Sequence, residues 1–300
     1  MTEAGGLAAE RSSNKSRLRG ALLLTLGVLG VEVAGGVASH SLALLADAAH
    51  MFMDVAALTL AWAGMALGER APTGRHTFGL ARAEVLAAFV NAEMLLVASL
   101  AILWEAWHRF RSPGPIHTEL MFGVAAVGLV ANVAAMRLLH AGRSKSLGMR
   151  AAYLEVLTDA LASLAVIVAA VVMARSRWFG LDALLSAAIA LVILPRGFGI
   201  LREAAHILLE GAPENLDIPG LRAAILAVPG VEAIHDVHFW TLTSGSHSAS
   251  VHIRAVSRSP RSEVLAGVQR VLREEGGVDH ATIQIEQGDE TVCHIAPEHA

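Results

Sequence analysis

The stretch Leu44-Leu45-Ala46-Asp47-Ala48-Ala49-His50-Met51-Phe52-Met53-Asp54 carries three metal-capable side chains within a long apolar segment. On an α-helix, residues three, four and seven positions apart share a face, so Asp47, His50 and Asp54 line one side. A carboxylate inside a membrane is costly, and it usually faces an ion, a cavity or a partner group. The stretch therefore predicts a membrane-spanning helix with a functional polar face.

A second apolar segment repeats this pattern with Glu155 and Asp159, again four residues apart. Antiparallel packing of the two helices would bring these carboxylates to His50 and Asp54. One imidazole nitrogen and three carboxylates form a donor set that binds zinc and similar dications. We predict a transport site of His50, Asp54, Glu155 and Asp159, with Asp47 one turn away as a supporting or entry group.

Composition indicates a membrane protein, because 54% of the 300 residues are hydrophobic and 17% are charged, against roughly 25% charged in soluble domains. Six apolar segments, near 20–39, 42–67, 85–107, 118–140, 151–174 and 179–201, have the length that crosses a bilayer. A single cysteine excludes a disulfide framework within one chain. No signal-peptide pattern is evident, and we expect neither a nucleic-acid partner nor an organic cofactor.

Basic residues predict the topology. The link between the first two segments has no Lys or Arg, whereas the links after the second and fourth segments have three each. The positive-inside rule then places both termini in the cytosol. Residues 1–19 are expected to be a disordered cytosolic tail, and residues 20–204 a transport domain of six membrane helices.

From about residue 205 the apolar runs shorten and alternate with turn signals. We predict a helix at 218–228, strands at 231–242 and 248–256, a helix at 260–275 and a strand at 281–286. This αββαβ order predicts a small cytosolic α+β domain, ferredoxin-like, over residues 205–290, followed by a tail at 291–300.

Repulsion among three carboxylates suggests a transport mechanism. No Lys or Arg is expected at their depth, so a cation or protons must offset the charge. A dication arriving from the cytosol would displace protons, which would return on the more acidic side. This exchange would make the protein a proton-driven antiporter. Simple hydrogen bonding between helices is the alternative, and it explains two paired sets of side chains poorly.

Several motifs resemble the cation diffusion facilitator family of zinc, cadmium and cobalt exporters, in its bacterial six-span branch. They are SLALLADAAHM at 41–51, HTFG at 76–79, RAEVLAAFVN at 82–91, SLGMRAAYL at 146–154, LLEGAP at 208–213 and HFWTLTSG at 238–245. The resemblance implies a homodimer in a bacterial inner membrane that exchanges metal for protons. It also implies a zinc site between the second and fifth spans.

This chain departs from the family at Glu155, where a histidine is usual. A third carboxylate makes the site harder, which favours manganese, iron or cobalt more than the usual pair does; zinc remains the first expectation. In the loop after the second span, only His76 matches a further metal site of some members, so we expect no site there.

The resemblance also implies a regulatory metal site in the cytosolic domain, where His235 and His252 match binding positions and Glu286 falls at a third. Cys293 and His294 are candidates for a further soft ligand. His238, His247 and His299 are expected to be solvated surface residues.

Two other classes of function stay open at this point. A membrane sensor would bind metal without moving it. An intramembrane enzyme is the other hypothesis, but the sequence has no HExxH motif, nucleophile elbow or phosphate loop.

Overall fold

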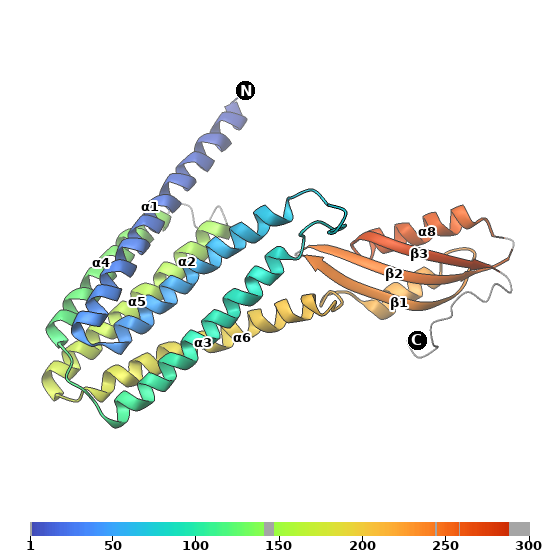
Figure 1. Cartoon of the computed structure of the whole chain (residues 1–300). Helices are drawn as coiled ribbons and strands as arrows, with labels where there is room; N and C mark the ends of the chain where they lie inside the picture. Colours follow the sequence, from blue (N-terminus) through green and yellow to red (C-terminus); the bar gives the residue numbers. More distant parts are fainter. Residues whose placement is uncertain (1, 141–146, 244, 258, 288–300) are drawn as a thin grey trace. The chain divides into compact units, whose positions relative to one another are not determined.

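The computed structural model describes residues 2–140, 147–243, 245–257 and 259–287 (Figure 1). Within these residues, six helices are long and apolar enough to cross a membrane. They are α1 (Thr2–Ser39), α2 (Leu42–Gly68), α3 (Ala83–Arg111), α4 (Thr118–His140), α5 (Leu147–Ser176) and α6 (Gly180–Leu208).

The predicted spans are all found, and α1, α3, α5 and α6 extend several residues beyond the predicted bounds, α1 by the most. Helix α1 begins at Thr2, so the expectation of a disordered tail at 1–19 is wrong for the described part of that segment. Only Gly20–Ser39 of α1 has the hydropathy of a membrane span. Ala, Glu, Arg and Lys in the preceding segment are good helix formers, which allows the helix to continue beyond its apolar part.

The chain divides into two compact units, Met1–Leu58 with Asn91–Gly199 and Thr59–Val90 with Ile200–Ala300. In the first unit, α4 packs against both α1 and α5 (Figure 1). Buried side chains of α2, α4 and α5 share a core that contains Leu44, Met121 and Val166. A smaller core joins Ala21 of α1 with Leu139 of α4 and Val156 of α5.

Contacts at successive levels show that α2 and α5 run antiparallel. His50 of α2 lies near Glu155 of α5, and Leu44, six residues earlier, shares a core with Val166, eleven residues later. Because the two sequences advance in opposite directions, the polar faces of both helices meet along their length. This arrangement is the one that the transport-site prediction required.

The start of α2 is held by a carboxylate from α6. Ser41 Oγ donates a hydrogen bond to Asp182 Oδ1 at 2.6 Å, and the backbone N–H groups of Leu42 and Ala43 donate to the Asp182 carboxylate at 2.7 and 3.2 Å. These N–H groups have no partner within their own helix, since the first turn of any α-helix leaves them free. Asp182 therefore caps α2 from a neighbouring helix.

The second unit contains the predicted αββαβ domain, which confirms the α+β expectation. Its elements are α7 (Ile218–Leu226), β1 (Val231–Thr243), β2 (Ser246–Ala255), α8 (Arg261–Glu274) and β3 (Val278–Gln287). In the sheet, β2 lies between β1, to which it is antiparallel, and β3, to which it is parallel.

One face of this sheet forms the domain core. Val251 and Ile253 of β2 are fully buried, together with Ile225 of α7 and Val268 of α8. Residues in a strand alternate between the two faces, so His252 belongs to the opposite face. The side chains of the candidate cytosolic site are therefore on the face away from α7 and α8.

Candidate metal centre

Three of the four predicted transport-site residues lie together between α2 and α5. His50 Nε2 is 3.6 Å from Asp54 Oδ2 and 3.8 Å from Glu155 Oε1. One ligand atom from each residue lies within 4.8 Å of the others. Two ligand atoms on one tetrahedral zinc ion lie about 3.3 Å apart. The spacing of this membrane triad, His50, Asp54 and Glu155, therefore suits a single dication after a small contraction.

Glu155 has a partner that we did not expect from the sequence. Arg196 of α6 places Nη1 3.2 Å from Glu155 Oε1, the same oxygen that faces His50. The expectation that no Lys or Arg lies at this depth is therefore wrong. Arg196 stands within the predicted span 179–201, so the signal was present in the sequence, but only packing shows which carboxylate it meets.

The fourth predicted ligand, Asp159, is not part of the membrane triad. It is 4% exposed, and its Oδ1 has no hydrogen-bond partner among the described residues. Asp47, predicted as a supporting group, is 1% exposed and close enough to Asp159 for their charges to interact. Both side chains thus lie in a buried region next to the triad, one helical turn along α2 and α5.

Glu32 of α1 was not among the predicted site residues; it is 1% exposed and close enough to interact electrostatically with Asp47 and Asp159. A carboxylate within a 20-residue apolar segment was a visible signal. It is the only carboxylate in the apolar part of its helix, Gly20–Ser39, and a lone carboxylate does not reveal which helix it faces.

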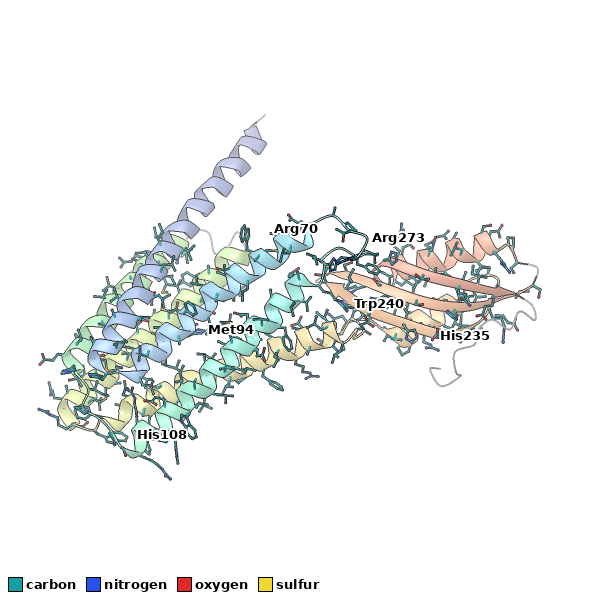
Figure 2. The ribbon with its side chains drawn as sticks, viewed as in Figure 1. Arg70, Met94, His108, His235, Trp240 and Arg273 are labelled. Carbon is teal, nitrogen blue, oxygen red and sulfur yellow. The ribbon has the colours of Figure 1, made fainter. Side chains whose placement is uncertain are left out.

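In the α+β domain, the structure brings His235, His252 and Glu286 together on three adjacent strands; Figure 2 labels His235 on β1. His235 pairs with His252 across β1 and β2, and Glu286 lies on β3. Glu286 Oε1 is 3.4 Å from His235 Nε2 and 3.7 Å from His252 Nδ1. Two imidazoles and one carboxylate are donor types that bind zinc and similar dications.

Asp236 is a further member of this region that sequence reasoning missed. It has a positive φ of 47°, within an irregularity of the β1–β2 register between His235 and His238. Its Oδ2 lies 3.5 Å from His252 Nε2, and its Oδ1 lies 2.8 Å from His238 Nε2. The hydrogen bond with His238 lowers the pKa of the Asp236 carboxyl. His238, expected to be only solvated, therefore has a specific partner.

The remaining sequence candidates give no further group. Among the described residues, only the membrane triad and the His235–His252–Glu286 set bring three metal-capable side chains together. His76 is exposed in the loop after α2 and belongs to neither set. Cys293, His294 and His299 lie outside the described residues.

Six apolar helices followed by a small α+β domain indicate an integral, multi-pass membrane protein. Residues 18–209 match the family described as cation efflux transmembrane domain, and residues 213–288 match cation efflux protein, cytoplasmic domain. The chain therefore belongs to the cation efflux family, a family of metal-ion transporters, as the motif resemblance predicted.

Three relatives cover nearly the whole chain. It is 41% identical to the cation efflux system protein CzcD of Alcaligenes sp. (strain CT14), over 91% of this chain and 87% of that protein. It is 40% identical to the zinc transporter ZitB of Escherichia coli (strain K12), over 91% and 88%. It is 35% identical to the cadmium, cobalt and zinc/H(+)-K(+) antiporter of Bacillus subtilis (strain 168), over 91% and 89%.

Proposed function

We propose that this protein exports divalent metal ions from the cytosol, zinc first among them, in exchange for protons. The observation that carries the proposal is the membrane triad, which puts one imidazole and two carboxylates at single-ion spacing between two membrane helices. Relatives at 40% and 35% identity are named as a zinc transporter and as a cadmium, cobalt and zinc antiporter. Zinc commonly binds three protein ligands of the nitrogen and oxygen types that the triad offers.

In the proposed mechanism, Asp159 completes the site as a fourth ligand when metal enters. The side chain needs only to turn along α5 toward Glu155, one helical turn away. Metal binding removes protons from ligands that must be deprotonated, and exposure to the acidic side returns them. Because protons replace the metal ion, the net charge of the site stays nearly constant. This lowers the free-energy cost of switching the site from exposure on one side of the membrane to exposure on the other.

Glu155 supports an alternative cargo of the same class. It replaces the imidazole that the family resemblance implies at this position, and carboxylate oxygens suit manganese and iron better than imidazole does. Arg196 at 3.2 Å offsets part of that added negative charge. A harder metal is therefore the second candidate, and the metal panel in the test below separates the two.

We further propose that His235, His252 and Glu286 bind a regulatory metal ion in the cytosol. Their donor atoms lie within 4.8 Å of one another, and His252 Nδ1 is buried without a hydrogen-bond partner among the described residues. The match to a cytoplasmic cation efflux domain supports a homodimer. Both termini would be cytosolic and the membrane would be the bacterial inner membrane, with lipid around the six spans.

The test is metal uptake into proteoliposomes with an imposed pH gradient, with zinc, cadmium, cobalt, manganese and iron compared. Asp54→Ala should abolish flux of the preferred metal, because it removes one of the triad ligands. Glu119→Gln is the matched control, since Glu119 is exposed in the first turn of α4 and outside the triad. Flux that survives Asp54→Ala would exclude this site. Metal binding without flux in the unmodified protein would favour a sensor.

A further inference from the structure

A buried polar cluster lies one helical turn further into the helix bundle than the membrane triad. Its members come from four helices: Glu32 of α1, Asp47 of α2, Asn132 of α4, and Asp159 and Ser163 of α5. None is more than 4% exposed. We call this group the inner cluster. It deepens the proposed exporter function and depends on it.

Side chains of the inner cluster have hydrogen-bonding atoms with no partner. Glu32 Oε2, Asn132 Nδ2, Asp159 Oδ1 and Ser163 Oγ are all buried without one among the described residues. Burying such atoms unpaired is unfavourable, and native structures rarely leave several together. Three of the four are oxygen atoms, which a bound cation can satisfy.

The backbone of α4 is shaped to admit these side chains. A Cβ atom on Gly128 would lie 2.9 Å from Glu32 Oε1 and 3.3 Å from Ser163 Oγ. The carboxylate of α1 and the hydroxyl of α5 thus converge on the same point of α4. Asn132 follows Gly128 by four residues, which puts it on the same face of that helix.

Charge defines the kind of ligand. Glu32, Asp47 and Asp159 are close enough for mutual electrostatic repulsion, and among the described side chains no Lys or Arg forms an ion pair with any of them. Arg196 pairs with Glu155 of the triad instead. Three buried carboxylates without a counter-charge are strongly unfavourable. The cluster therefore requires cations in its resting state.

The donor atoms favour a hard monovalent cation over the transported metal. The inner cluster offers carboxylate, hydroxyl and amide groups and has no imidazole or thiolate, whereas His50 belongs to the triad. Oxygen-only sites suit hard cations, and imidazole suits zinc and other transition metals. The two neighbouring sites therefore differ in the class of ion that they would hold.

We propose that the inner cluster binds the monovalent cation that moves against the metal, with Glu32 as its defining residue. Asp159 belongs to both sites: it can complete the metal site only by leaving the inner cluster. Levels separated by four residues along a helix are about 6 Å apart. Occupation of one site by a cation at that distance disfavours a cation in the other. Metal and counter-ion then bind in alternation, which is the requirement for coupled exchange.

The experiment measures zinc uptake by reconstituted full-length protein under separate gradients of protons, potassium and sodium. The unmodified protein should respond to at least one gradient, and that gradient identifies the counter-ion. Glu32→Gln keeps the side-chain shape and removes the charge. It should retain uptake down a zinc gradient and lose the response to the counter-ion gradient. Glu119→Gln should behave as the unmodified protein.

Separate outcomes test the separate claims. No zinc uptake by the unmodified protein would refute the proposed export function itself. Zinc uptake that Glu32→Gln leaves fully gradient-responsive would overturn the inner-cluster proposal alone. Zinc uptake that no gradient stimulates would overturn both the inner-cluster proposal and the exchange for protons, and would leave zinc transport itself standing. If the folded Glu32→Gln variant loses all zinc uptake, Glu32 is needed for metal transport itself. That result would overturn the claim that the inner cluster is a site separate from the metal site. If Glu32→Gln does not fold, Ser163→Ala takes its place, with a weakened gradient response expected.

Discussion

In the proposed metal site, the charge of Glu155 is partly offset by Arg196 of a neighbouring helix. A carboxylate where the motif resemblance implies imidazole adds a negative charge to the membrane triad. The guanidinium at 3.2 Å partly neutralises it and shares the oxygen that faces His50. Arg196 therefore competes with an incoming metal ion for the same ligand atom.

Removing this competitor should tighten metal binding. Arg196 is 55% exposed and Glu155 is 35% exposed, and pairs of that kind contribute about 0.2–1 kcal/mol. We therefore expect Arg196→Gln to lower the zinc Kd by a factor of about 1.5 to 5, measured by titration of purified protein in detergent.

A double-mutant cycle adds the control for this prediction. Glu155→His alone leaves Arg196 beside an imidazole, whereas Glu155→His with Arg196→Gln removes the unmatched charge. Arg196→Gln should then change the zinc Kd by a different factor in the Glu155→His background than in the unmodified protein. Equal factors in the two backgrounds would show that Arg196 does not act through Glu155.

At the scale of the helix, the position of α2 matters most, because it carries His50 and Asp54. Asp182 of α6 accepts three hydrogen bonds from the first turn of α2. The contact anchors the N-terminal end of α2 to α6, the helix that also supplies Arg196. A shift of α2 along its axis would change the distances within the triad and the distance from the triad to Arg196.

Asp182→Ala should destabilise the protein, because it leaves two buried backbone N–H groups and Ser41 without their acceptor. Hydrogen bonds to charged groups contribute about 1.5–3 kcal/mol each, so a clear decrease in Tm is expected. Thermal unfolding in detergent, followed by circular dichroism, measures it, with Glu119→Ala as the exposed control. An unchanged Tm would mean that the α2 cap carries no stability.

At the scale of the whole molecule, the chain has two separate metal-capable groups, each in a different compact unit, among its described residues. A cytosolic site that responds to metal can adjust a transporter only if binding at the two sites is energetically linked. The linkage is testable without any assumption about how the units are oriented.

Replacing both cytosolic imidazoles should raise the metal concentration for half-maximal transport without abolishing flux. The change is His235→Ala with His252→Ala, and initial uptake rates over a range of zinc concentrations measure it. His280→Ala is the control, because His280 is exposed on β3 and outside the metal-capable set. An unchanged half-maximal concentration would remove the regulatory role.

Much of this organisation could be predicted from local sequence patterns. Apolar length identified the membrane helices, and the i, i+4 spacing of His50 with Asp54 identified the helix faces that meet at the triad. Alternation and turn signals identified the αββαβ domain. These features depend on the geometry of single elements, which the sequence specifies directly.

Tertiary structure alone decided the contacts between elements. It paired Arg196 with Glu155, brought Glu32 of α1 toward Asp47 and Asp159, and turned Asp236 toward His252 through a register irregularity. Arg196, Glu32 and Asp236 have no like partner at the helical or strand spacing of their own elements, so no periodicity marks them. Sequence spacing determines which side chains share a face, whereas the packing of separate helices and the register between strands determine which faces meet.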